Sequence, residues 1–286
     1  MAGDGRLPRL LTEQQVEDFR RDGVLVLRSF YDRDAEIEPI QRCIHHLIGL
    51  LLTKYGLSIR QSAFSADAFD DGYQALIAHD RQIGGEIYDA IKNIPAFVRL
   101  AASGKHDELL AQLFGTEMPG IAHGGYGIRI DNPNEERYRA GWHQDYPAQL
   151  RSPEGLVFWS PLAAVTAEMG PVTFCLGSHR DGMVPVHMKD PRNPDKTGAY
   201  ALRLQNEEQL VAKYSQVAPT AEPGDLIVID YATIHCSGSN RSKRSRWTMQ
   251  MRYFNFDHPF AAKIGWRGCF AAGIRLQDVH PELVLD

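Results

Sequence analysis

Hydrophobic positions in the first part of the chain recur at the spacing of amphipathic helices. Thr12 and Gln15 form a capping box, and the apolar positions that follow predict a helix ending at Gly23. A longer helical pattern then occupies positions 34–55. The same analysis predicts helical stretches around 80–100 and 106–114, and a short buried strand at 24–27. We therefore expect residues 1–118 to be mostly helical support.

After Pro119 the pattern changes to short apolar runs separated by turn residues. Predicted strands lie within 121–130, 156–165, 172–176, 226–231 and 245–256. The segment 181–198 is rich in Pro, Asp, Gly and Asn and is long enough to be a lid. This succession predicts a jelly-roll core over 119–258, a C-terminal extension over 259–286, and one α+β domain over 1–286.

Composition excludes several classes of protein. The 286 residues include 31 basic and 36 acidic side chains, a net charge of −5 that argues against a nucleic-acid-binding surface. No apolar run approaches the roughly 20 residues that span a bilayer, and the opening lacks a signal-peptide pattern, so we expect a cytoplasmic protein without membrane contact. The four cysteines (Cys43, Cys175, Cys236 and Cys269) lie far apart, as expected of reduced residues rather than disulfides or a zinc knuckle.

The candidate chemistry lies in Trp142-His143-Gln144-Asp145 and the distant His235. Residues i and i+2 of a strand point to the same side, so His143 and Asp145 could aim at one point. His235 follows an apolar strand and could supply a third donor. Two histidines and one carboxylate on one side of a metal leave three positions open, an arrangement typical of non-haem Fe(II) oxygenases.

Other functions are compatible with the same residues. A zinc hydrolase can use two histidines and one aspartate around a bound water, and a catalytically inactive jelly-roll binding module is a third class. The basic run from Arg241 to Arg246 could suggest a nucleic-acid patch, but no aromatic platform accompanies it. We expect Arg241, Lys243 and Arg244 to lie in a solvated loop and Arg246 to begin a strand.

Several motifs together resemble the phytanoyl-CoA dioxygenase (PhyH) family of Fe(II)/2-oxoglutarate oxygenases. That family pairs an HxD motif with a distal His, a small polar residue two positions later and an Arg eleven positions later, which here are His235, Ser237 and Arg246. Gly170-Pro171-Val172, Gly177-Ser178-His179-Arg180, Pro223-Gly224-Asp225 and the N-terminal 12–28 segment are also similar. The resemblance extends to about residue 256 and implies a double-stranded β-helix, a cupin-like core.

The resemblance also implies site residues and chemistry. By this resemblance, His143, Asp145 and His235 would be the ligands of an Fe(II) ion. Arg246 would pair with the distal carboxylate of 2-oxoglutarate, Ser237 would donate to the same group, and Gln144 and Trp159 would fall in the cosubstrate pocket. O2 and 2-oxoglutarate would be converted to succinate and CO2, and the retained carboxylate of Asp145 favours hydroxylation over halogenation. The alternative hydrolase would not need a buried cation at the position of Arg246.

The substrate is expected to be a small, polar metabolite. If Arg246 points inward, alternation along its strand places Thr248, Gln250 and Arg252 on the same side. Arg129 and Tyr146 are further candidates for substrate contact. On this interpretation Arg252→Ala would raise the apparent Michaelis constant for the substrate and leave 2-oxoglutarate affinity unchanged. The sequence does not indicate the substrate's identity or the oligomeric state.

Overall fold

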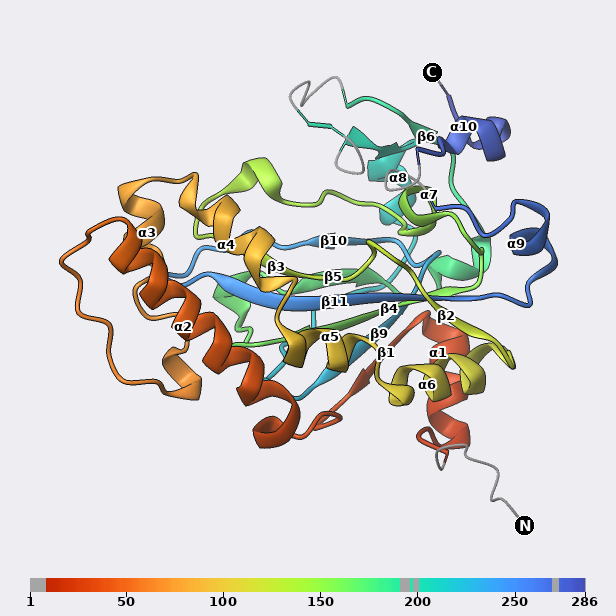
Figure 1. Ribbon diagram of the computed structural model, residues 1–286. Coiled ribbons are helices and arrows are strands. Elements are labelled where there is room, and N and C mark those ends of the chain that lie inside the picture. The colour runs from red at the N-terminus through yellow and green to blue at the C-terminus, as the bar shows by residue number, and fades with distance from the viewer. Residues whose placement is uncertain (1–8, 191–195, 198–200, 269–272, 286) are drawn as a thin grey trace, which may run out of the picture.

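The computed structural model describes residues 9–190, 196–197, 201–268 and 273–285 (Figure 1). Its α-helices are α1 Glu13–Asp22, α2 Glu38–Lys54, α3 Tyr73–His79, α4 Ile83–Ile91, α5 Pro95–Ala101, α6 Gly104–Phe114, α7 Tyr146–Gln149, α8 Glu207–Val211, α9 Pro259–Lys263 and α10 Leu276–Val279. Shorter helical turns are the π-turn η1 Arg33–Ile37 and the 3₁₀ turns η2 Ala66–Ala68, η3 Glu136–Tyr138, η4 Ala167–Met169, η5 Ser178–Asp181 and η7 Pro281–Leu283. The strands are β1 Val24–Leu27, β2 Pro119–Ile121, β3 Gly127–Asp131, β4 Gly155–Pro161, β5 Val172–Cys175, β6 Val186–His187, β7 Arg203–Leu204, β8 Gln216–Val217, β9 Leu226–Asp230, β10 His235–Ser237 and β11 Arg246–Asn255.

Two antiparallel sheets form the core. The larger sheet has six strands in the order β1-β9-β4-β11-β2, with β3 also pairing with β11. The smaller sheet has three strands in the order β10-β5-β8. β1 comes from the mostly helical N-terminal region, at the position where the sequence predicts a short buried strand, and it pairs with β9. That region therefore supplies an edge of the large sheet as well as the helices that cover it.

Alternation along the central strands assigns each side of the large sheet a different task. On β11, Trp247, Met249 and Met251 belong to the hydrophobic cluster that the helices share. Gln250, between Met249 and Met251, and Arg252, which follows Met251, line a cavity on the opposite side of the sheet. Because successive strand side chains point to opposite sides, one strand contributes to both the core and the site. The structure therefore places Gln250 and Arg252 on the cavity side of β11, where alternation from Arg246 would place them.

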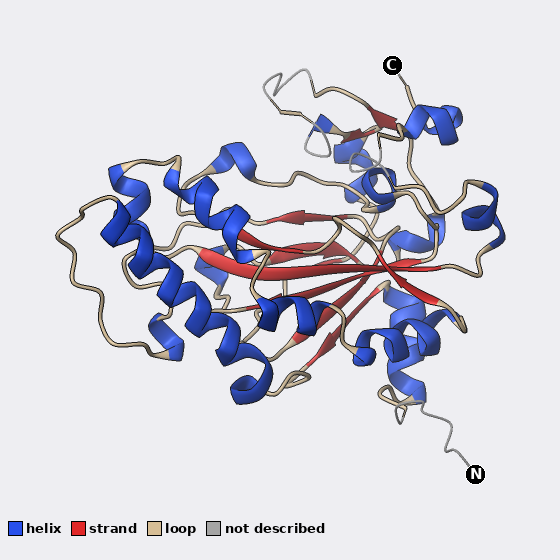
Figure 2. Cartoon of the chain, in the orientation of Figure 1, coloured by secondary structure: helices blue, strands red, loops and turns tan. Residues whose placement is uncertain are grey.

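The helices gather on one side of the large sheet (Figure 2), where their apolar faces bury against it. The predicted helix over 34–55 is η1 followed by α2, and the one over 80–100 is divided into α4 and α5. The division falls at Ile94, which has an extended backbone (ψ 118°) directly before Pro95. A residue preceding proline is disfavoured in helical conformation, so the new helix can begin only at Pro95.

The segment that follows β5 includes the predicted lid. The predicted lid 181–198 includes β6, which pairs with β7, but residues 191–195 and 198 lie outside the described residues.

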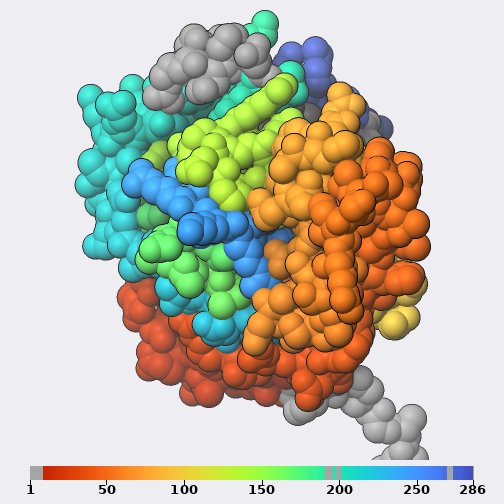
Figure 3. All heavy atoms as spheres, turned by 90° about the vertical axis from the view of Figure 1, so that its left-hand side faces the viewer, coloured from red at the N-terminus to blue at the C-terminus, as the bar shows by residue number. Residues whose placement is uncertain are grey.

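The light-blue segment that leads into β11 reaches the surface in Figure 3, with Arg241 and Lys243 exposed, whereas Arg246 begins the strand as predicted. Cys43, Cys175 and Cys236 are free thiols, and Cys269 is not among the described residues. None of the described helices combines the length and the apolar character that a membrane span requires.

Candidate metal centre

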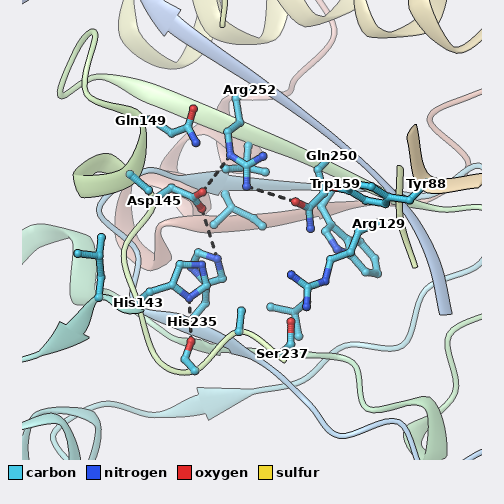
Figure 4. Close-up of a pocket in the computed structure, with 17 residues that line it drawn as sticks. Tyr88, Arg129, His143, Asp145, Gln149, Trp159, His235, Ser237, Gln250 and Arg252 are labelled. Carbon is cyan, nitrogen blue, oxygen red and sulfur yellow. Dashed lines mark hydrogen bonds and ion pairs between the residues drawn. The ribbon is translucent and has the colours of Figure 1, made fainter. Parts of the chain in front are cut away.

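Two stretches of chain bring the predicted metal ligands together. His143 and His235 exchange a pair of backbone hydrogen bonds of 3.0 Å, and their ring centroids are 4.2 Å apart. The backbone N–H of Asp145 donates to the carbonyl of Tyr231 at 2.9 Å, which holds the carboxylate beside them. One donor atom from each of the three side chains lies within 4.8 Å of the other two (Figure 4). The structure thus brings the three predicted ligands together.

The backbone around these ligands differs from the strand that was expected. His143 makes a single β-bridge with His235, and Asp145 is the N-cap residue of α7. Aspartate side chains commonly cap helices, but the side chain of Asp145 makes no capping bond to α7. It is directed instead toward the histidines and Arg252 (Figure 4).

Hydrogen bonds determine which imidazole nitrogens remain open. Nδ1 of His143 lies 2.8 Å from the carbonyl of Gly141, and Nδ1 of His235 lies 2.8 Å from the carbonyl of Thr233. A carbonyl only accepts, so each Nδ1 carries the proton and each Nε2 keeps its lone pair. Nε2 of His235 is 3.4 Å from Oδ2 of Asp145, a buried oxygen without a hydrogen-bond partner among the described residues. The Nε2 atoms and Oδ2 of Asp145 are therefore suited to coordinate a divalent metal ion.

Local electrostatics favour the protonation states that metal binding requires. Burial, reinforced by His235, lowers the pKa of His143 to about 4. Burial alone would raise the pKa of Asp145, but the charge of Arg252 and the two neighbouring histidines outweigh it and leave that pKa below its usual value. At neutral pH the site therefore presents a neutral imidazole at His143 and an ionised carboxylate.

The metal donors open into a cavity of about 990 Å³, including its mouth, between the two sheets. Of the eight residues predicted to contact cosubstrate or substrate, five line the cavity. They are Arg129, Trp159, Ser237, Gln250 and Arg252. Arg129 and Trp159 lie on the other side of the cavity from the metal donors in Figure 4. The cavity thus has a metal end and a remote end.

Two other predicted site residues are absent from the described wall of this cavity. The buried amide of Gln144 donates to the carbonyls of Gly182 (2.9 Å) and Ala232 (2.6 Å), so it fastens loops together. The hydroxyl of Tyr146 bonds to Nε2 of His280 at 2.7 Å, and its side chain is only 1% exposed. The structure therefore places neither residue on the described cavity wall: Gln144 lies between two residues that point to the site, and Tyr146 begins α7.

Arg246 also differs from its predicted placement. Its guanidinium contacts the carbonyl of Gly170, and its Nη2 lies 2.9 Å from Oδ2 of Asp131. The side chain is 1% exposed and does not belong to the described cavity wall. Nε of Arg129 contacts Oδ1 of the same Asp131 at 2.8 Å, and Arg129 does line the cavity. The cation of the wall at the remote end is therefore Arg129, with Arg246 behind it.

Sequence analysis missed several residues of the site. Tyr88 on α4, Gln149 on α7 and Leu202 beside β7 line the cavity. None of them belongs to a motif, and their positions depend on how helices and loops pack over the cavity. Asp131 carried a weak signal, since it lies two residues after Arg129 on the same strand.

Comparison with protein families gives a match over most of the chain. The family model described as Phytanoyl-CoA dioxygenase (PhyH) matches residues 19–248. Phytanoyl-CoA dioxygenase domain-containing protein 1 homolog of Dictyostelium discoideum is 23% identical over 274 residues, covering 87% of this chain and 92% of that protein. Phytanoyl-CoA dioxygenase domain-containing protein 1 of Bos taurus is 25% identical over 264 residues, with coverage of 82% and 87%.

Solved structures with the same fold include three iron and 2-oxoglutarate proteins. EctD from S. alaskensis with 2-oxoglutarate and 5-hydroxyectoine has a TM-score of 0.55 and 19% identity, covering 88% of this chain and 83% of that one. The non-heme alpha ketoglutarate dependent carbocyclase SnoK has a TM-score of 0.55 and 15% identity, with 88% coverage of both chains. The epimerase SnoN, in complex with Fe³⁺, alpha ketoglutarate and nogalamycin RO, has a TM-score of 0.53 and 17% identity, with coverage of 92% and 91%. These similarities confirm the predicted α+β jelly-roll fold.

Proposed function

The chain belongs to the phytanoyl-CoA dioxygenase (PhyH) family, and on this basis we propose that it is an Fe(II)/2-oxoglutarate-dependent dioxygenase that hydroxylates a small, polar metabolite. The observation that carries the proposal is the convergence of His143, Asp145 and His235 within 4.8 Å, with open donor atoms, in a cavity between the sheets. Two histidines and one carboxylate are the protein ligands typical of non-haem Fe(II) oxygenases.

In this proposal the three side chains hold Fe(II) and the backbone keeps them in place. The carbonyls of Gly141 and Thr233 fix the imidazole rings through their Nδ1 protons. Bound together, Fe(II) and 2-oxoglutarate supply an oxidising reaction that consumes O2 and releases succinate and CO2. Asp145, retained as a carboxylate, completes the three-ligand set and favours a hydroxylated product.

The remote end of the cavity suits the distal carboxylate of 2-oxoglutarate. Ser237 offers a hydroxyl donor there and Trp159 a flat apolar wall. Arg129 supplies a planar guanidinium, the group best suited to grip a carboxylate through two hydrogen bonds. We assign the direct contact to Arg129 and give Arg246 the role of holding Asp131, which in turn orients Arg129.

The substrate would lie near the metal end, where polar side chains line the cavity. Gln149, Gln250 and Arg252 all reach its surface. Amide groups and a guanidinium lose hydration when a ligand covers them unless the ligand offers hydrogen bonds in return. This favours a metabolite with several oxygen or nitrogen acceptors over a hydrocarbon.

An anaerobic titration tests the proposal. Purified metal-free protein receives Fe(II) and then 2-oxoglutarate, and we expect the visible charge-transfer band of the chelate to develop with one equivalent of each. Asp145→Ala is the matched control and should give no band. Admission of air should then yield succinate from the wild-type protein. A folded wild-type protein that gives no band and retains zinc instead would favour the hydrolase.

A further inference from the structure

The carboxylate of Asp145 has two oxygens in different surroundings. Nε of Arg252 lies 3.0 Å from Oδ1, and the side chains of the pair are 18% and 4% exposed. Oδ2 has no hydrogen-bond partner within the described structure and faces His235 at 3.4 Å. One oxygen is therefore held by the protein, and the other is available to a metal.

The guanidinium that holds Oδ1 is itself anchored. Nη1 of Arg252 donates to the carbonyl of Gly125 at 3.2 Å, and Nη2 donates to Oε1 of Gln250 at 3.2 Å. Figure 4 shows Arg252 reaching from β11 to Asp145 with Gln250 on its other side. Because the guanidinium is planar and its donors serve partners in different directions, it cannot rotate without breaking hydrogen bonds. The position of Oδ1 is thereby fixed.

We propose that Arg252 is a positioning residue that makes Asp145 a one-oxygen metal ligand, an inference that rests on the proposed function. Three protein donors leave three coordination positions open on a six-coordinate metal. If Asp145 bound through both oxygens, it would occupy one of the positions that the cosubstrate and O2 need. The hydrogen bond from Arg252 withholds Oδ1 and directs Oδ2 toward the histidines.

This role differs from the substrate contact that strand alternation suggested for Arg252. A substrate contact predicts a change in substrate affinity and an unchanged metal site. A positioning role predicts a weaker metal site in the absence of any substrate. Simple charge repulsion predicts the opposite, because removing a cation near a divalent ion would tighten its binding.

Mn(II) binding to the metal-free protein separates these cases. Free Mn(II) is counted by its electron paramagnetic resonance signal during titration of wild type, Arg252→Gln and Arg252→Lys. We expect Arg252→Gln to bind Mn(II) about 10- to 100-fold more weakly, the usual effect of losing a hydrogen bond to a metal ligand. Arg252→Lys restores the charge without the planar fork, so its affinity should lie between the other two.

Arg244→Gln serves as the matched control. Arg244 pairs with the buried carboxylate of Asp70 at 2.7 Å, away from the metal donors. Its loss breaks a comparable arginine–aspartate pair, so any general loss of stability should appear in both variants. Thermal unfolding monitors that loss, and Mn(II) affinity should change only in the Arg252 variants.

Each other outcome has a distinct meaning. In one case the wild-type protein binds Mn(II) and Arg252→Gln binds it equally or more tightly. That result would overturn the positioning role and leave the proposed function intact. An Arg252→Lys variant identical to wild type would show that a single charged donor is sufficient, and it would overturn the role given to the anchored planar guanidinium. Wild-type protein that fails to bind Mn(II) or Fe(II) would remove the proposed function itself, and the positioning role with it.

Discussion

Asp131 and Asp145 are both ionised carboxylates between the same two sheets, and each pairs with an inward-facing arginine of β11. Both oxygens of Asp131 are occupied, by Arg129 at 2.8 Å and by Arg246 at 2.9 Å. Asp145 accepts from Arg252 at 3.0 Å through one oxygen, and the other is unsatisfied within the described structure. The count of satisfied oxygens, and not burial or charge, distinguishes a structural counter-ion from a ligand.

The same comparison shows how charge is distributed along the cavity. At the metal end, Arg252 forms an ion pair with Asp145 beside the two histidines. At the remote end, Asp131 pairs with both Arg129 and Arg246. The proposed function places the distal carboxylate of 2-oxoglutarate against Arg129 at this end and the other end of the cosubstrate on the metal. The predictions below test the two ends separately.

The largest effect is expected for Asp145→Asn. The amide keeps the size of the side chain but lacks the negative charge and one acceptor oxygen, so the metal loses a ligand. Mn(II) affinity should fall beyond the roughly 10- to 100-fold that accompanies loss of a supporting hydrogen bond. Succinate formation with Fe(II) and 2-oxoglutarate should be undetectable. Metal affinity equal to that of wild type would show that Asp145 is not a ligand.

Asp131→Asn makes the same chemical change at the other carboxylate. It removes the carboxylate charge that pairs with Arg129 and with the buried Arg246, and breaking a buried pair costs about 3–5 kcal/mol. Urea unfolding should show this loss. In the folded fraction Mn(II) affinity should stay near the wild-type value, because the metal donors are untouched. A variant that keeps its stability but loses the metal would reverse the roles assigned to the two carboxylates.

Arg129→Gln examines the remote end with a smaller expected effect. Loss of a charge-assisted contact to the distal carboxylate should weaken 2-oxoglutarate binding by about 1.5–3 kcal/mol, roughly 10- to 150-fold. Calorimetric titration of the Mn(II)-loaded protein gives this affinity directly, and Mn(II) affinity itself should not change. Arg246→Gln is the comparison, and the assignment to Arg129 fails if that variant loses 2-oxoglutarate while Arg129→Gln retains it.

The sequence predicted features that depend on local spacing. The HxD pair and the distal histidine identified the three metal donors, and alternation along β11 placed Gln250 and Arg252 on the cavity side. The capping box at Thr12 is present as predicted, with the helix ending at Gly23. The alternation and the capping box are determined by a few neighbouring residues, whereas the distant His235 was assigned through the family resemblance.

Features that depend on distant partners were not predictable. Arg246 meets Asp131 because β11 and β3 pair in a register that places them opposite each other, across 115 positions of sequence. Tyr146 was proposed for substrate contact because it adjoins the metal motif, but it begins α7 and its hydroxyl bonds to His280. Periodicity reveals on which side a residue lies, but not which residue on a neighbouring element it meets.

The smallest expected effect is the change in the free energy of unfolding per pH unit that His106 causes. His106 lies in the core, so this effect tests the fold independently of the metal site. His106 is fully buried between the helices and the large sheet, where Nε2 lies 2.6 Å from the hydroxyl of Tyr31, and burial lowers its pKa from 6.5 to about 3. Between these values the unfolded chain binds a proton that the folded protein does not, so stability falls as pH decreases, by up to about 1.4 kcal/mol per unit. His106→Gln retains a hydrogen-bonding side chain and removes this contribution.

The comparison of wild type and His106→Gln by urea unfolding between pH 4 and pH 6.5 isolates the contribution of His106. In metal-free protein His143 acts in the same direction, since its pKa is also lowered, to about 4, but it is present in both proteins and cancels in the difference. The stability of the variant should therefore depend less steeply on pH, while Mn(II) affinity at pH 7 stays equal. Parallel stability curves would mean that His106 is protonated in the folded core, and the acid sensitivity of the protein would then have to arise from the site's own histidine and carboxylates.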